Sequence, residues 1–242
     1  MLKIHSIETF WTNEWPWIRT VFFLQWCEFK CLYCHNPDTI PTKWWKLTTN
    51  EQLLEIVEKN KIYFGNKGGV TVSGWEPLLQ AKELISFFKE LKNRWFNITV
   101  DTNGYLMNDD VMELLKYTDL VLLDLKHLDD EKHKILTGVS NKNVLNFLDY
   151  LENNNIKFWI RHVLVPTYTD DEKHIESIWK YLKNFKYLER LEILPYHTLW
   201  KYKWKELWLD YKLENIEPPS RENLDNTKNT LQKYIKNVYV RG

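Results

Sequence analysis

The strongest constraint on the fold is the alternation of short β-rich runs with helical patterns along the 242-residue chain. The run L-V-L-L-D-L-K at 120–126 is almost wholly apolar, which is typical of a strand buried on both faces of a parallel sheet. About six such β–α units predict an α/β protein with right-handed crossovers. Strands are expected at 20–24, 69–74, 98–104, 120–126, 157–165 and 191–196, and helices at 48–63, 81–92, 109–117, 141–154, 171–184 and 220–236. Thr48 and Glu51 are expected to form a capping box on the first helix.

Length and charge narrow the class of protein. A chain of this size suits one domain, so we expect residues 1–242 to form a single domain. Lys and Arg together number 33, as do Asp and Glu, so a net charge of zero gives no support for a nucleic-acid or acidic-membrane partner. The first residues lack the apolar core of a signal peptide, and no apolar run approaches the roughly 20 residues of a membrane span. We therefore expect a cytoplasmic protein.

Polar residues gather directly after the predicted strands. In parallel α/β folds the ligand site lies at the carboxyl ends of the strands, so five such clusters are expected to share one rim. They are the loop that carries Cys27, Cys31 and Cys34, Ser73-Gly74-Trp75-Glu76, Asp101-Thr102-Asn103-Gly104, Asp124-Leu125-Lys126-His127 and Pro195-Tyr196-His197.

The cysteines stand together as Cys27, Cys31 and Cys34, at C-x3-C-x2-C spacing. Three thiolates can hold three irons of a [4Fe–4S] cluster and leave the fourth iron open to a substrate. One alternative is a zinc site completed by His35, although such sites usually split their ligands into two separated pairs. A second alternative is three buried cysteines without a metal. The spacing favours the cluster.

The cysteine spacing, with an aromatic residue before the last cysteine, resembles the radical S-adenosylmethionine (SAM) superfamily. Further stretches narrow the resemblance to the pyruvate formate-lyase activating enzymes, in order along nearly the whole chain. They are I-H-S-I-E-T-F-x-T-N-E-x-P-x-I-R-T, C-L-Y-C-H-N-P-D-T, V-T-V-S-G-x-E-P-L-L-Q, D-T-N-G, V-L-L-D-L-K and L-P-Y-H-T-L-x-K-Y-K-W. The fold implied by this resemblance is a partial (β/α)6 TIM-like barrel of the radical SAM type.

The resemblance implies an oxidoreductase that works under anaerobic conditions. A reduced [4Fe–4S] cluster would cleave SAM to a 5′-deoxyadenosyl radical, which takes a hydrogen from a glycine Cα of pyruvate formate-lyase (formate C-acetyltransferase). Flavodoxin or ferredoxin would supply the electron. Three cysteines leave room for one cluster only, which favours pyruvate formate-lyase as the partner. The alternatives are an activase of another glycyl radical enzyme, another radical SAM enzyme, and a zinc-stabilised binding module.

The same resemblance implies roles for matching residues. Cys27, Cys31 and Cys34 would bind the cluster and carry the chemistry. The residues expected to bind SAM are Tyr33, His35, Asn36, Gly74, Trp75, Glu76, Asp101, Lys126 and His197.

Other positions are expected to bind a cation or the protein substrate. Asp101 and Asp124 would hold a monovalent cation beside SAM. Glu14, Arg19 and Arg161 would contact the peptide that carries the target glycine.

Tryptophan is abundant at 13 and glycine scarce at 7, whereas ordinary usage would give roughly 17 glycines. Glycine is the residue of the resembled family at ten of the tryptophan positions: Trp11, Trp15, Trp17, Trp26, Trp44, Trp45, Trp75, Trp95, Trp200 and Trp208. We hypothesise that UGA codons for glycine have been translated as tryptophan. The alternative is a tryptophan-rich core or interface. Trp159, Trp179 and Trp204 are expected to be genuine.

Overall fold

A computed structural model describes residues 1–11, 17–39, 45–74 and 76–241. The chain divides into two compact units, the first made of residues 1–28 and 39–122 and the second of residues 29–38 and 123–242. The boundary at residues 28 and 29 falls inside the cysteine motif. The single domain expected for the whole chain stays a prediction.

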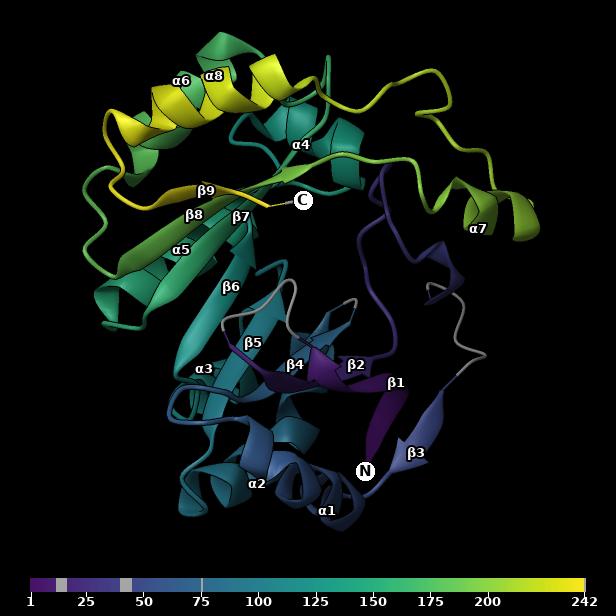
Figure 1. The fold of residues 1–242 in the computed structure, drawn as a ribbon, viewed down its shortest axis with the longest axis vertical. Coiled ribbons are helices and arrows are strands. Elements are labelled where there is room, and N and C mark those ends of the chain that lie inside the picture. Colours follow the sequence, from purple (N-terminus) through teal and green to yellow (C-terminus); the bar gives the residue numbers. More distant parts are fainter. Residues whose placement is uncertain (12–16, 40–44, 75, 242) are drawn as a thin grey trace. The chain divides into compact units, whose positions relative to one another are not determined.

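The first unit contains strands in the order β3-β1-β2-β4-β5 (Figure 1). Strand β1 pairs antiparallel with β2 and β3, whereas β2, β4 and β5 run parallel. The strands are β1 (Leu2–Trp11), β2 (Arg19–Leu24), β3 (Lys46–Thr48), β4 (Gly69–Gly74) and β5 (Asn97–Thr102). The helices are α1 (Asn50–Asn60), α2 (Ala81–Asn93) and α3 (Asp109–Leu115), with 3-10 turns at Lys61–Tyr63 and Pro77–Gln80. A further 3-10 turn, Pro37–Thr39, lies at the boundary of the two units. Leu24 pairs with Gly74, so the loops after β2 and β4 leave from the same edge.

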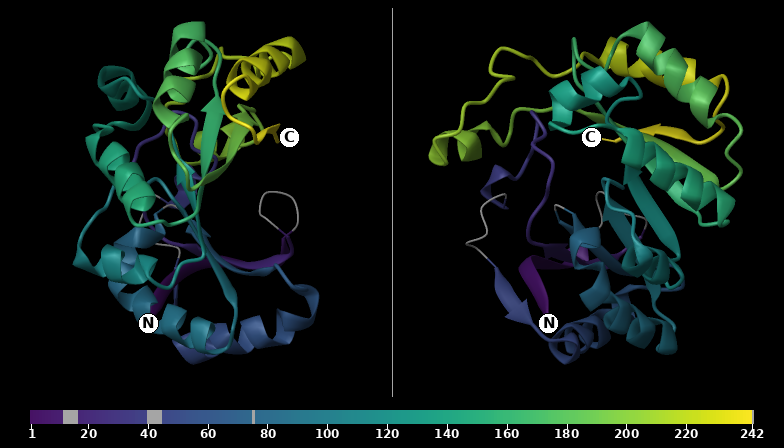
Figure 2. Two further views of the ribbon diagram at one scale, coloured as in Figure 1. Left: turned by 90° about the vertical axis from the view of Figure 1, so that its left-hand side faces the viewer. Right: turned by 180° about the vertical axis from the view of Figure 1, so that it is seen from behind.

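Helix α1 begins with a capping box one residue later than expected. The Thr49 hydroxyl accepts from the Gln52 amide at 3.4 Å, and the Gln52 side chain accepts from the Thr49 amide at 3.1 Å. The expected pair, Thr48 and Glu51, was wrong because Thr48 belongs to β3, where it pairs with Leu2. Helices α1 and α2 then lie together on one side of the strands (Figure 2).

The second unit contains the parallel strands β7, β8 and β9. Their bounds are β7 (Phe158–Leu164), β8 (Leu188–Pro195) and β9 (Val238–Val240), while β6 (Leu120–Asp124) runs across the boundary of the two units. The helices are α4 (Asp130–Thr137), α5 (Lys142–Asn153), α6 (Glu172–Leu182), α7 (Lys201–Glu206) and α8 (Arg221–Gln232). Helices α6 and α8 lie side by side, with Trp179 stacked on Tyr234 at 3.5 Å between ring centroids (Figure 2).

Strand β6 is buried on both faces, as the apolar run at 120–126 predicts. Val121, Leu122 and Leu123 of β6 have no exposed surface. Each fully buried side chain of this kind contributes roughly 1.5–3 kcal/mol to folding. The mixed α/β class with parallel strands is therefore confirmed.

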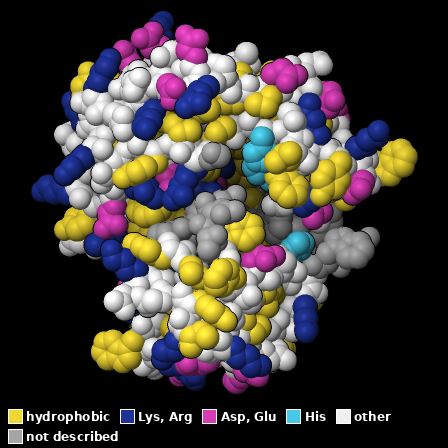
Figure 3. Space-filling model, viewed as in Figure 1, with side chains coloured by type: hydrophobic (Ala, Val, Ile, Leu, Met, Phe, Trp, Pro, Cys, Tyr) yellow, Lys and Arg dark blue, Asp and Glu magenta, His cyan; other side chains and the backbone are white. Residues whose placement is uncertain are grey.

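The surface carries both signs of charge. Figure 3 shows acidic and basic side chains interspersed over the visible face, in keeping with the zero net charge. No helix in the described parts of the chain is long and apolar enough to cross a membrane.

Candidate functional site

Cys27 follows β2 in the first unit and lies beside the end of β5. The Asn103 side chain donates a hydrogen bond to the Cys27 sulfur at 3.7 Å. Asn103 is itself fixed, because its backbone amide donates to a carboxyl oxygen of Glu76 at 2.8 Å. A thiolate that accepts an amide hydrogen bond is stabilised, which suits a sulfur ligand of an iron–sulfur cluster. Asn103 is not among the residues expected to bind the cluster or SAM, although it lies in the quoted D-T-N-G stretch.

Glu76 organises the loops around Cys27. Its fully buried carboxyl group accepts from the Thr102 hydroxyl at 2.6 Å and from the Leu78 amide at 3.0 Å, in addition to Asn103. Its backbone amide donates to the Trp26 carbonyl at 3.1 Å. Burial raises the pKa of Glu76 to about 8, against the hydrogen bond from Thr102, which lowers it. Both carboxyl oxygens are occupied by the protein, so Glu76 acts on the shape of the loops.

Asp101 lies at the end of β5 in the same unit. It accepts a hydrogen bond from the hydroxyl of Ser73, near the end of β4, at 2.7 Å. The expected neighbours Ser73 and Asp101 are thus brought together. Gly74 adopts φ 109°, and a Cβ atom there would lie 2.3 Å from the Leu24 carbonyl oxygen, so only glycine fits this turn.

The second unit holds Cys31 and Cys34 in a loop anchored to its core. The Cys34 amide donates to the Cys31 carbonyl at 3.1 Å, and the Trp204 indole donates to the Cys34 carbonyl at 2.9 Å. Tyr33, between the two cysteines, is 4% exposed and belongs to a hydrophobic cluster that includes Leu136. The loop is therefore held on both sides. Burial raises the pKa of the Cys31 thiol to about 12, opposed by the charge of Lys126.

Lys126 is a buried cation beside this loop. Its ammonium group lies 2.8 Å from a carboxyl oxygen of Asp124 and 5.3 Å from the centre of the Tyr33 ring. Burial disfavours the charge, but Asp124 raises the pKa of Lys126 well above its ordinary value. A cation held charged under a cysteine loop suits an anionic ligand such as a carboxylate.

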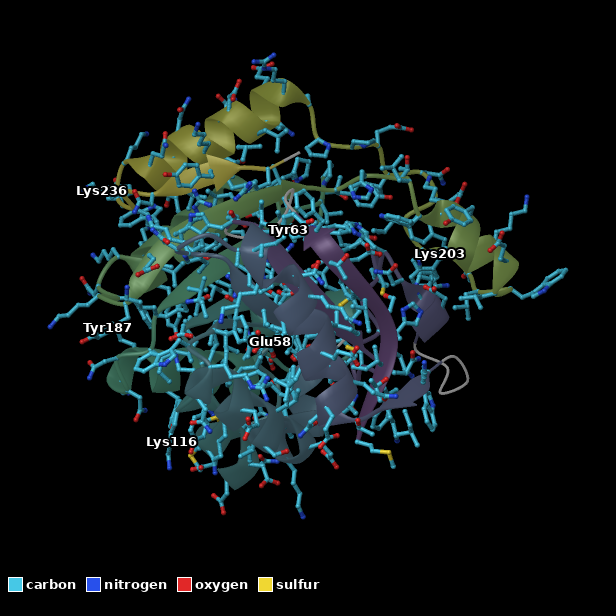
Figure 4. All side chains as sticks on the ribbon, turned by 60° about the horizontal axis from the view of Figure 1, so that its bottom comes forward. Glu58, Tyr63, Lys116, Tyr187, Lys203 and Lys236 are labelled. Atoms are coloured by element: carbon cyan, nitrogen blue, oxygen red, sulfur yellow. The ribbon has the colours of Figure 1, made fainter. Side chains whose placement is uncertain are left out.

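The rings of His35 and His197 lie against each other beside Cys34, with centroids 4.2 Å apart and planes tilted by 35°. Burial, with help from His197, lowers the pKa of His35 to about 3, so the ring is neutral at pH 7. Asn36 accepts a hydrogen bond at 2.7 Å from Lys203, which lies on α7 (labelled in Figure 4). The structure thus gathers the expected residues of the second unit around its cysteines.

Some expected site residues lie elsewhere. Arg19 has no exposed surface and sits at the amino end of β2, where it pairs with Gly69, away from the edge that carries the cysteine loop. Its guanidinium group donates to Thr71 and to oxygens of Asn97. We expected Arg19 to contact the substrate peptide, whereas the structure gives it a structural role in the sheet. Arg161 lies half-buried in β7. Glu14 and Trp75 lie outside the described residues.

The cysteine sulfurs and the aspartate carboxylates are the groups expected to hold the iron–sulfur cluster and the monovalent cation. None of the three cysteines forms a disulfide and each is partly exposed, and three thiolates suit a [4Fe–4S] cluster with one open iron better than a single ion. Within the described ranges, no three His, Cys, Asp or Glu side chains are arranged to hold one metal ion. Asp101 and Asp124 belong to different units, so the monovalent-cation site stays a prediction.

Comparison with known proteins decides the family. The sequence model of the radical SAM superfamily matches residues 21–178. The chain belongs to the radical SAM superfamily. Members of this superfamily use SAM and a [4Fe–4S] cluster, for which the chain has Cys27, Cys31 and Cys34.

Curated radical SAM relatives place the chain within the family of pyruvate formate-lyase activating enzymes. It is 44% identical over 239 residues to the pyruvate formate-lyase-activating enzyme of Clostridium pasteurianum, covering 98% of each protein. It is 41% identical over 235 residues to the pyruvate formate-lyase 1-activating enzyme of Escherichia coli K12, covering 96% of each. The chain is therefore a radical SAM enzyme of this family, and the alternative of a zinc-stabilised binding module is excluded.

A solved structure supports the radical SAM fold. Streptococcus suis SuiB bound to its precursor peptide SuiA matches with a TM-score of 0.72 at 17% identity, over 92% of this chain and 48% of that one. The expected partial TIM-like barrel of the radical SAM type is confirmed by this match.

Proposed function

We propose that the chain activates a pyruvate formate-lyase by generating a glycyl radical on it, and that it works in the cytoplasm. The observation that carries this proposal is the identity of 44% over nearly the full length to a curated activating enzyme. Because the family model spans residues 21–178, which include parts of both compact units, we also propose that the whole chain is one radical SAM core.

When bound, the reduced [4Fe–4S] cluster supplies the electron that cleaves SAM homolytically to a 5′-deoxyadenosyl radical. Cys27, Cys31 and Cys34 would hold the cluster through their thiolates. Burial raises the pKa of the Cys31 thiol, so binding of the cluster would release its proton. The hydrogen bond from Asn103 would stabilise a thiolate at Cys27.

The charged ends of SAM are met by residues of opposite charge. Lys126 is proposed to bind the methionine carboxylate, sharing its ammonium protons with Asp124. Asp101, oriented by Ser73, is proposed to bind the methionine ammonium. The neutral His35 and the neighbouring His197 are proposed to offer ring faces and nitrogen atoms to the ribose and adenine. Each charged contact contributes roughly 1.5–3 kcal/mol.

Other proposed contacts are less central. Tyr33 lies under the ammonium of Lys126 and positions it, while Asn36 is held by Lys203 at the border of the site. The backbone of Gly74 and Glu76 is proposed to meet SAM, and so is that of Trp75, which lies outside the described residues. Glu14 and Arg161 are proposed to contact the peptide of the protein substrate, and flavodoxin or ferredoxin is the proposed electron donor.

Anaerobic reconstitution tests the enzyme class. The protein should bind about four irons with matching acid-labile sulfide, as a single cubane requires. With dithionite it should convert SAM to 5′-deoxyadenosine and methionine. The control Cys31→Ala removes one thiolate from a loop. It should abolish cluster binding and SAM cleavage while leaving the folded secondary structure intact. One zinc without sulfide, or undiminished cleavage by Cys31→Ala, would overturn the proposal.

A further inference from the structure

Four tryptophans adopt a left-handed backbone conformation. Their φ angles are 62° at Trp17, 88° at Trp26, 64° at Trp95 and 55° at Trp208. L-residues rarely adopt positive φ, because the Cβ atom approaches a carbonyl oxygen, and a bulky residue there is an outlier. Among the described residues that are not glycine, the others with positive φ are Asn155 and Thr167.

Trp95 occupies the left-handed position of a Schellman motif that ends α2. Its amide donates to the Lys92 carbonyl at 3.0 Å, and the next amide, of Phe96, donates to the Leu91 carbonyl at 3.0 Å. This pair of hydrogen bonds requires the left-handed residue between them, which is usually glycine. The Trp95 side chain is 94% exposed, so burial of the indole does not compensate for the backbone strain.

Trp208 ends α7 in the same way. Its amide donates to the Lys205 carbonyl at 3.1 Å, and the Leu209 amide donates to the Trp204 carbonyl at 2.9 Å. The Trp208 side chain is 95% exposed. Two helices in different units thus place a solvent-exposed indole where the backbone favours glycine.

Two other helices of the chain end with the residues normally found at this position. Gly138 closes α4 with φ 82°, and its amide donates to the Lys134 carbonyl at 2.8 Å. Asn155 follows α5 with φ 59°. Its amide donates to the Glu152 carbonyl at 3.2 Å and the next amide, of Ile156, donates to the Leu151 carbonyl at 3.0 Å, which is the pattern seen at Trp95 and Trp208. Glycine and asparagine are the residues that accept this conformation most easily.

Trp17 and Trp26 flank β2 and are about half exposed. The φ of 88° at Trp26 lies beyond the usual left-handed helical value and is typical of glycine in a tight turn. The carbonyl of Trp26 accepts from Glu76, and the residue directly precedes Cys27, so this turn sets the start of the cysteine loop.

The three tryptophans that we expected to be genuine have ordinary backbone conformations and packed side chains. Trp159 is 6% exposed with the Arg190 guanidinium 4.4 Å above its ring. Trp179 stacks on Tyr234, and the Trp204 indole donates to Cys34. None of these three has a positive φ. Backbone conformation therefore separates the four left-handed tryptophans from these three. Trp11, Trp45 and Trp200, which also stand at positions where we expected glycine, have no positive φ.

We infer that the polypeptide made in its native cell carries glycine at positions 17, 26, 95 and 208. One reassigned codon accounts for all four at once, whereas four independent changes to tryptophan would each introduce backbone strain. The inference rests on backbone conformation and exposure and is independent of the proposed function.

Stability measurements on single variants test the conformational argument. Trp95→Gly and Trp208→Gly should each raise the folding equilibrium constant about fivefold, because relief of the left-handed strain exceeds the chain entropy of glycine. Trp95→Ala removes the same indole but keeps a Cβ atom, so it should gain clearly less than Trp95→Gly. The control Trp179→Gly should lower the constant, since it deletes a stacked ring and loosens a helix. Equal effects of glycine and alanine at position 95 would contradict the argument.

The sequence of the natural protein tests the inference directly. Peptide sequencing by mass spectrometry of the protein isolated from its own cells should find glycine at positions 17, 26, 95 and 208 and tryptophan at 159, 179 and 204. The gene should carry UGA at the first set and UGG at the second. Tryptophan in the natural peptides at the first set would overturn the inference.

Discussion

Glu76→Gln tests whether one buried carboxyl group organises the loops around Cys27. The two carboxyl oxygens accept from two backbone amides, Leu78 at 3.0 Å and Asn103 at 2.8 Å, and from the Thr102 hydroxyl at 2.6 Å. An amide has only one acceptor oxygen. In either orientation of the glutamine side chain, its NH2 group therefore faces a backbone N–H that cannot find another acceptor, whether or not Glu76 is ionised.

The magnitude follows from this single lost acceptor. A buried donor left without a partner costs about 1–3 kcal/mol. With a urea m-value of about 3 kcal/mol per molar for a chain of this size, the unfolding midpoint should fall by about 0.3–1 M. Fluorescence and circular dichroism of the cluster-free protein measure this shift without any contribution from iron.

The matched control is Glu58→Gln, a change of the same kind at a surface residue labelled in Figure 4. Glu58 pairs with Arg94 at 3.2 Å with both side chains well exposed, so the free energy of unfolding should change by less than about 0.5 kcal/mol. The midpoint should then move by less than about 0.2 M. If Glu76→Gln unfolds at the same urea concentration as Glu58→Gln, the role assigned to Glu76 is wrong.

Further variants probe other groups. Lys126→Met should lower SAM affinity at least about tenfold through loss of a charge-assisted bond while iron content and the affinity of the control Lys132→Met stay unchanged; equal SAM affinities would misplace the carboxylate site. Burial lowers the pKa of His174 to about 2, so the folded state excludes a proton that the unfolded chain accepts below about pH 6.5, and stability is lost as pH falls through that value. His174→Phe should remove about 1.4 kcal/mol of that loss per pH unit; parallel urea midpoints of both proteins from pH 7 to 5 would contradict this. Arg19→Lys should lower stability by several kcal/mol, by removing hydrogen bonds inside the sheet, yet leave the affinity for the substrate peptide unchanged; loss of peptide binding in the folded variant would restore its expected site role.

Much of the parallel sheet could be predicted because its signal is local. The apolar run at 120–126 corresponds to β6, and the polar groups after it, Asp124 and Lys126, meet as an ion pair. Strands β1 and β3 escaped prediction because their residues are partly exposed and pair antiparallel, which leaves no continuous apolar run. The helix cap was displaced by one residue because T-x-x-E and T-x-x-Q both occur at its start.

The roles of single polar residues could not be predicted to the same depth. Arg19 and Glu76 both stand in motif positions, but their partners Thr71, Asn97 and Thr102 come from strands far along the chain. Only the paired strands reveal that these side chains are buried and hydrogen-bonded inside the protein. At four of the ten positions where motif spacing indicated glycine, by contrast, the tryptophan adopts the left-handed backbone conformation that favours glycine.

The most direct test of the proposed function is electron paramagnetic resonance of pyruvate formate-lyase after anaerobic incubation with this protein, SAM and a reductant. Two proteins should be used, one with tryptophan and one with glycine at the ten positions named in the sequence analysis. Each should first be checked for a bound cluster. The predicted result is a glycyl radical on pyruvate formate-lyase. If the target glycine carries deuterium at Cα, that deuterium should be found in 5′-deoxyadenosine. SAM cleavage without a radical on pyruvate formate-lyase, by cluster-loaded protein of either sequence, would contradict the proposed partner and point to another glycyl radical enzyme.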